Sequence, residues 1–213
     1  MQMYGKMLVA GLVGAAVMVP SAASATFLPG TEPPVEYDCS ATSAHAGVSG
    51  RCEQQLTKSV ASHTDVIGAA VVTTKGASFA FSGDGASTAT SSASVASSVV
   101  NVNLGLLRVR AVGARSTVHS VCGDPSNYGN DLFTGSVHVD RLVINGHVYT
   151  DLSSGTFTTP YGKVTVGATW RNYFDSSFDA DEGLTKVAVL VTSGHTSVRI
   201  AASDVTVWSF PCR

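Results

Sequence analysis

Four carboxylates lie close together in the sequence toward the carboxyl end of the chain, and together they could bind calcium. They are Asp175, Asp179, Asp181 and Glu182. Calcium takes about six to eight oxygen ligands, commonly from carboxylates gathered in one loop. We expect the segment to connect a strand ending at Phe174 to one starting at Thr185. Its spacing differs from that of an EF-hand loop, and a solvated connection would have the same composition. We therefore predict no tight metal site.

The histidines and serines show no spacing typical of catalysis or metal binding. None of the 6 histidines belongs to an H-x-x-x-H or H-E-x-x-H pattern, and no G-x-S-x-G elbow occurs. His138 and Asp140 share the polar face of one expected strand, and His147 flanks a turn. We therefore predict no catalytic, cofactor-binding or metal-binding residue and no enzymatic activity. A secreted hydrolase with an unrecognised active site is the alternative.

The aromatic residues between 161 and 178 could form a platform for a glycan, which would make the chain a carbohydrate-binding module. They are Tyr161, Trp170, Tyr173, Phe174 and Phe178. A strand directs alternate side chains to opposite faces. Counting by twos from Val164 places Trp170 and Phe174 on the core face and Tyr173 outside. An ordinary core with one surface aromatic explains the same residues.

The four cysteines are expected to form two disulfides. They are Cys39, Cys52, Cys122 and Cys212. An even number in an exported chain favours disulfides, and three pairings are possible. We predict Cys39–Cys52, which closes a local loop, and Cys122–Cys212, which ties the last strand to the body. Their spacing lacks the paired C-x-x-C or neighbouring histidines of a zinc site.

The first 25 residues have the features of a cleavable secretory signal. Lys6 precedes an apolar run from Met7 to Val19, and Ala23-Ser24-Ala25 supplies the small residues of a cleavage site. We predict cleavage before Thr26. The run is shorter than the roughly 20 residues that a spanning helix needs. No second apolar segment follows it, so we expect no transmembrane segment after cleavage. We expect a protein that is secreted and is either extracellular or associated with the cell envelope.

The charge of the chain gives no indication of nucleic-acid binding. The net charge is −2 at pH 7, and the nearest approach to a basic stripe is Arg108, Arg110 and Arg115. We divide the chain into a signal (1–25), an N-terminal arm with a cysteine-closed segment (26–62) and a β domain (63–213). Within 54–61 we allow for one helical turn.

From Val66 onward the pattern is that of short strands separated by turns. We predict a turn at Lys75-Gly76 and a strand through the Ala-, Ser- and Thr-rich stretch 86–98, for which a flexible linker is the alternative. The apolar positions change parity near Gly105, which predicts one long strand with a bulge. Asn145-Gly146 predicts a tight hairpin. The pattern favours an all-β fold, an antiparallel β-sandwich or open barrel of about 8–10 strands.

Three stretches of the chain resemble the choice-of-anchor P family of bacterial exported proteins. They are ASSVVNVNLGLLRVRAV at 96–112, LVINGHV at 142–148, and the pair 185–191 and 198–205. The resemblance covers roughly residues 66–207. It implies an extracellular or surface β domain and assigns no catalytic residue. We therefore expect a non-enzymatic module that acts by surface contact with an unknown extracellular or cell-envelope partner.

Overall fold

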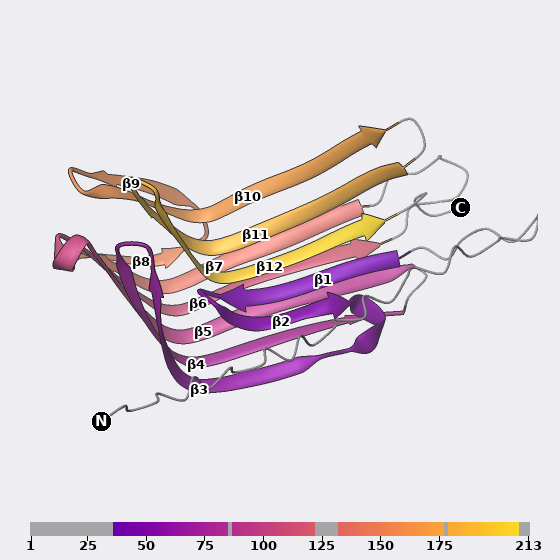
Figure 1. Ribbon diagram of the computed structural model, residues 1–213, viewed down its shortest axis with the longest axis horizontal. Helices are drawn as coiled ribbons and strands as arrows, with labels where there is room; N and C mark the ends of the chain where they lie inside the picture. Colours follow the sequence, from indigo (N-terminus) through magenta and orange to yellow (C-terminus); the bar gives the residue numbers. More distant parts are fainter. Residues whose placement is uncertain (1–35, 85–86, 122–131, 177–178, 209–213) are drawn as a thin grey trace, which may run out of the picture. The chain divides into compact units, whose positions relative to one another are not determined.

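The described part of the chain forms two antiparallel sheets of six strands each, and they do not close into a barrel (Figure 1). The computed structural model describes residues 36–84, 87–121, 132–176 and 179–208. Within these ranges the only helical segments are two short 3₁₀ turns, η1 (Cys52–Gln54) and η2 (Asn103–Gly105). The prediction of an all-β sandwich is confirmed. The described residues contain twelve strands, more than the number expected.

Sheet A contains the first and last strands of the described chain as neighbours. Its order is β2 (Ala46–Arg51), β1 (Glu36–Ser43), β12 (Thr196–Trp208), β11 (Asp179–Ser193), β10 (Gly162–Ser176) and β9 (Gly155–Thr159). The pairing of β1 with β12 runs from Glu36↔Trp208 to Thr42↔Ala202. Residues that we expected to stand in an N-terminal arm before 63 therefore supply β1 and β2.

Sheet B is a meander in which each strand pairs with the next along the chain. Its order is β3 (Thr57–Ile67), β4 (Ala70–Gly83), β5 (Thr88–Val102), β6 (Leu107–Val121), β7 (Leu132–Ile144) and β8 (His147–Leu152). The chain passes from β8 in this sheet to β9 in the other. The expected hairpin between β7 and β8 is confirmed, with left-handed φ of 46° at Asn145 and 90° at Gly146.

The core lies between the sheets, where small side chains let them approach closely. The Ala-, Ser- and Thr-rich stretch forms β5, as predicted, and buries residues such as Ala93 and Val100. Hydroxyls join the sheets within this layer: the Ser116 and Ser203 oxygens lie 2.8 Å apart, and Ser91 donates to the Ser40 carbonyl at 2.5 Å. Buried hydroxyls need such partners, because an unpaired polar group costs about 1–3 kcal/mol.

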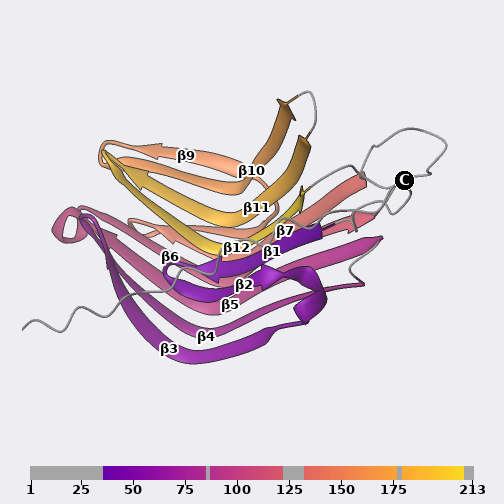
Figure 2. The same cartoon turned by 45° about the vertical axis from the view of Figure 1, so that its right-hand side comes forward.

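Each sheet is bent along a row of residues that we call its crease (Figure 2). In sheet B the pairing is interrupted in one row at Ala61, Gly76, Ala96, Gly113 and Asp140. In sheet A the corresponding row is Gly167, Ala188 and Ala201. Every second strand has a left-handed residue there: Gly76 (φ 60°), Gly113 (61°), Asp151 (55°), Gly167 (71°) and Ala201 (48°). Such bulges bend a strand and increase its twist.

The crease also reverses which side chains face the core. Strand β4 buries Val72 and Thr74 on one side of Gly76 but Ala77 and Phe79 on the other. Side chains at even positions of β4 therefore face the core before the crease, and side chains at odd positions face it afterwards. The predicted turn at Lys75-Gly76 is wrong, because the left-handed glycine there forms a bulge inside β4.

Two other local predictions also need correction. The parity change near Gly105 marks a chain reversal between β5 and β6, because Asn103, Leu104 and Gly105 all have positive φ (50°, 57° and 91°). The helical turn allowed for within 54–61 is replaced by η1 followed by β3, since the segment from Thr57 pairs with β4.

Candidate ligand-binding site

A polar pocket of about 350 Å³ opens on the outer face of sheet A. This volume lies within the range of about 300–1,000 Å³ that is typical of small-molecule sites. Its lining residues are Ser40, Thr42, Trp170, Thr185, Arg199, Ala202 and Asp204. They come from β1, β10, β11 and β12, so four strands build the site.

Strand register explains why these residues meet. Trp170, Thr185, Asp204 and Ser40 are successive cross-strand partners and form one row. Two residues along, on the same face, the next row consists of Ala168, Val187, Ala202 and Thr42. The first row supplies an aromatic ring, a carboxylate and hydroxyls. The second supplies mostly small, buried side chains, which leave room above them.

Arg199 reaches the site from beyond the crease. Its guanidinium carbon lies 5.0 Å from the centroid of the Trp170 ring, within the range of a cation–π interaction. The left-handed Ala201 lies between Arg199 and the first row of the pocket (φ 48°). The stacked guanidinium holds the indole and leaves planar donors at the rim of the pocket.

Asp204 is the carboxylate of the pocket, and two hydroxyls hold it. Thr185 Oγ1 donates to Oδ1 at 2.5 Å, and Thr206 Oγ1 donates to Oδ2 at 3.3 Å. Burial nevertheless raises the pKa of Asp204, and it outweighs these hydrogen bonds and the nearby charge of Arg199. Asp38 adds to the rise. The fold thus holds an acidic group where ionisation is less favourable than in water.

The prediction that Trp170 faces the core is wrong. It is 37% exposed and lines the pocket. Counting by twos from Val164 fails because Gly167 is a left-handed bulge in the crease, beyond which the faces of β10 exchange. An isolated glycine within a strand pattern indicates such a bulge, and this signal could have revealed the site. Tyr161 is exposed at the turn before β10, whereas the side chains of Tyr173, Phe174 and Phe178 lie outside the described residues.

The acidic segment lies mainly in strands rather than in a loop. β10 continues to Ser176 and β11 begins at Asp179, with Asp175 opposite Ala180. The side chains of Asp175, Asp179 and Asp181 lie outside the described residues. Glu182 is described, and burial raises its pKa while the charge of Arg171 lowers it. Among the described residues no three acidic, histidine or cysteine side chains could together hold a metal ion.

The structure brings the expected pair of His138 and Asp140 together at the crease of sheet B. Nε2 of His138 lies 2.9 Å from Oδ1 of Asp140 and 3.6 Å from Oδ1 of Asp151. Arg115 contacts the same Asp140 oxygen at 3.3 Å. With a cation already on Asp140, this is a surface ion-pair network, which typically contributes little to stability.

One histidine contacts a hydroxyl, the kind of pair that a hydrolase could use. Nδ1 of His119 lies 2.8 Å from Oγ1 of Thr90. A catalytic pair of this kind normally has a third group that orients the base. Among the described residues, no carboxylate is paired with His119. His147 and His195 are exposed, and His63 lies 3.0 Å from Asp65.

The disulfide between Cys39 and Cys52 is confirmed. The sulfur atoms are 2.05 Å apart and both residues are buried, so that η1 is tied to β1 on the core side of sheet A. Cys122 and Cys212, the other expected pair, lie outside the described residues.

Fold and site together define an all-β sandwich with a polar, aromatic-bordered pocket on one face. Neither a family model, nor a curated protein, nor a solved structure matches the chain. The resemblance to the choice-of-anchor P family therefore stays a prediction. No helix in the described part of the chain has the length and apolar character needed to cross a bilayer.

Proposed function

We propose that the protein is an exported, non-enzymatic binding module whose pocket on sheet A takes a polyhydroxylated ligand, by chemistry a sugar. One observation carries the proposal: the partly exposed indole of Trp170 borders a hollow whose other walls are a carboxylate, a guanidinium and hydroxyls. Sugar rings have an apolar C–H face that packs on aromatic rings. Their neighbouring hydroxyls can donate to Asp204 and accept from Arg199.

The state of Asp204 supports a binding role. A carboxylate whose pKa is raised by burial in a cleft is typical of functional sites. Thr185 and Thr206 fix its two oxygens, which lowers the entropy that a ligand must overcome. The small side chain of Ala202, two residues before Asp204 on the same face of β12, lines the pocket and leaves space beside the carboxylate.

A glycan array probed with the mature chain, followed by calorimetry with the best sugar, tests this function. Trp170→Ala should weaken binding by about 30-fold, as expected for truncation of an aromatic hot spot. Tyr161→Ala is the matched control, because Tyr161 is also exposed and precedes the same strand but lies outside the pocket. Failure of every sugar to bind, or equal losses in the two variants, would contradict the proposal.

Export is the second part of the proposal. The features of residues 1–25 support it, and a disulfide between Cys39 and Cys52 is typical of chains that fold in an oxidising compartment. Mass analysis of protein recovered from the medium should give an N-terminus at Thr26. An intact Met1 in the exported fraction would exclude cleavage.

A further inference from the structure

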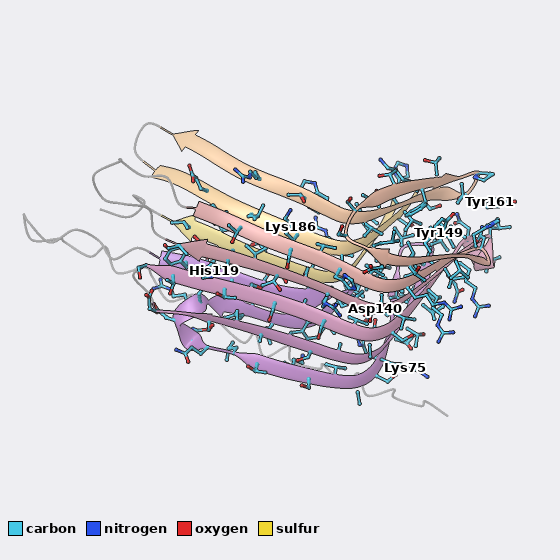
Figure 3. The ribbon with its side chains drawn as sticks, turned by 180° about the vertical axis from the view of Figure 1, so that it is seen from behind. Lys75, His119, Asp140, Tyr149, Tyr161 and Lys186 are labelled. Carbon is cyan, nitrogen blue, oxygen red and sulfur yellow. A yellow bond between two sulfur atoms is a disulfide. The ribbon has the colours of Figure 1, made fainter. Side chains whose placement is uncertain are left out.

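The outer face of sheet B beyond its crease is a basic and aliphatic surface, which we call the distal flank. Cross-strand register places its residues in three rows: Ser62, Lys75, Ser97, Val112, Arg141 and Thr150; Thr64, Thr73, Val99, Arg110, Val143 and Val148; and Val66, Val71, Asn101 and Arg108. No carboxylate stands in any row. Figure 3 shows Lys75 and Asp140 at the bend, where this flank begins.

The cations of the distal flank have no ion-pair partner among the described residues. Lys75, Arg108, Arg110 and Arg141 are exposed, and none forms an ion pair with the described residues. The nearby carboxylates, Asp140 and Asp151, lie at the crease and face His138. Arg108 and Arg110 follow each other on one face of β6, about 7 Å apart along the strand. Such a surface is complementary to an extended array of negative charge.

Leucines project from the end of this flank. The turn between β5 and β6 holds Leu104 in the left-handed region (φ 57°), with its side chain fully exposed (107%), and Leu106 is 53% exposed. Val66, 70% exposed, and Val71 stand in the adjoining row. Left-handed backbone is unfavourable for leucine, and water around the side chain is unfavourable as well. Nothing within the described residues covers this turn.

The combination of basic residues and exposed leucines fits a bilayer with anionic headgroups better than it fits a soluble polyanion or a nucleic acid. A soluble polyanion would be bound by the arginines alone and would leave the leucines in water. A single-stranded nucleic acid would favour aromatic platforms, and the three rows contain no aromatic residue. In a bilayer with anionic headgroups, the phosphates meet the arginines while apolar side chains enter the boundary of the acyl region.

We propose that the distal flank docks on an anionic phospholipid membrane, with Leu104 and Leu106 inserted among the headgroups. The pocket of Trp170 is on the outer face of the other sheet, so docking leaves it open. The proposal is independent of the ligand that the pocket takes.

Co-sedimentation of the mature chain with phosphatidylcholine vesicles, with and without phosphatidylglycerol, tests the proposal. Binding should require phosphatidylglycerol and weaken in about 1 M salt, where charges are screened beyond about 3 Å. Replacing Arg108, Arg110 and Arg141 by Gln should weaken binding by about fivefold for each arginine, since each basic residue near an anionic surface contributes by that factor.

Variants of the two leucines distinguish binding to a membrane from binding to a soluble polyanion. Leu104→Asn with Leu106→Asn should weaken vesicle binding by about tenfold or more, while Leu56→Asn, at an exposed leucine before β3, should leave it unchanged. A Leu104→Trp variant should show a blue shift of its fluorescence with phosphatidylglycerol vesicles. Absence of binding to these vesicles overturns the proposal. So does binding that depends on the arginines alone, which would indicate a soluble polyanion.

Discussion

The outer faces of the two sheets differ in how they handle charge and volume. On sheet A, the charge of Arg199 acts on the nearby Asp204, and the small side chain of Ala202 lines a hollow in the surface. On the distal flank of sheet B, four cations stand among valines without a carboxylate. A surface with both signs of charge and a pocket suits one small molecule. A surface with only positive charge and no pocket suits an extended partner. The two sheets are built from the same kind of strand, and the size and charge of the outward-facing residues decide which kind of partner each sheet can bind.

The largest effect is expected from removing the disulfide, which should weaken binding at the outer face of sheet A more than binding at the distal flank of sheet B. Replacing Cys39 and Cys52 by serine should lower the unfolding free energy by about 3 kcal/mol, the value for a short closed loop. Because β1 also carries Ser40 and Thr42, sugar binding should suffer more than vesicle binding. Urea unfolding and the two binding assays measure this. Equal losses at both faces would show that the disulfide acts on the whole sandwich.

The crease of sheet B should be the next most sensitive feature. Gly113→Ala would place a Cβ 1.8 Å from the present position of Asp140 Oδ2. It would also force alanine to adopt a left-handed φ of 61°. We expect a loss of about 2–3 kcal/mol from backbone strain and displaced packing. Gly194→Ala is the control, because its φ of 55° is similar but its Cβ would contact nothing. It should lose only about 1 kcal/mol. Equal losses would show that Asp140 moves aside freely.

Asp204 should make the stability of the protein depend on pH. A raised pKa in the fold means that the protonated form favours folding, so this contribution is present below the ordinary value of 3.8 and is lost as the pH rises. Asp204→Asn should therefore match or exceed the parent in stability at neutral pH. The parent should gain on the variant as the pH falls toward that value.

Thermal melting of both proteins across this range measures the effect of Asp204. Arg110→Gln is the control, and its difference from the parent should not depend on pH over the same range. A difference between Asp204→Asn and the parent that is constant with pH would mean that burial does not raise the pKa of Asp204.

The smallest effect is expected from calcium. We predict no tight site at Asp175, Asp179, Asp181 and Glu182, so millimolar calcium and chelator should give the same melting temperature. A ligand at about 100 times its dissociation constant adds about 2.7 kcal/mol, which melting would detect. A rise that disappears in an Asp179→Asn, Asp181→Asn variant would add a third recognition surface, beside the pocket strand β10.

Local chemistry explains which parts of this fold can be predicted from sequence. Asn145-Gly146 specifies its hairpin because both residues tolerate left-handed backbone. The all-β class follows from alternation, which survives on each side of a crease. Alternation counted across Gly76 or Gly167 fails, because a bulge changes the face without changing the composition. For this reason the alternation predicts Trp170 in the core, although the residue lines the pocket. A lone glycine can indicate the bulge in its own strand, but the crease forms because such interruptions stand in register across neighbouring strands.

The pairing of β1 with β12 has a consequence for the order in which the chain can fold. Sheet B joins only consecutive strands, so each hairpin can form as soon as its second strand has emerged from the ribosome or a translocation channel. Sheet A must wait, since Cys39 on its first long strand meets Val205 on its last. Contacts so distant along the chain form slowly. In a growing chain, β1 can pair early with β2 along one edge, but its other edge stays open until β12 is made, almost at the end of synthesis. That edge makes β1 the strand most dependent on a chaperone.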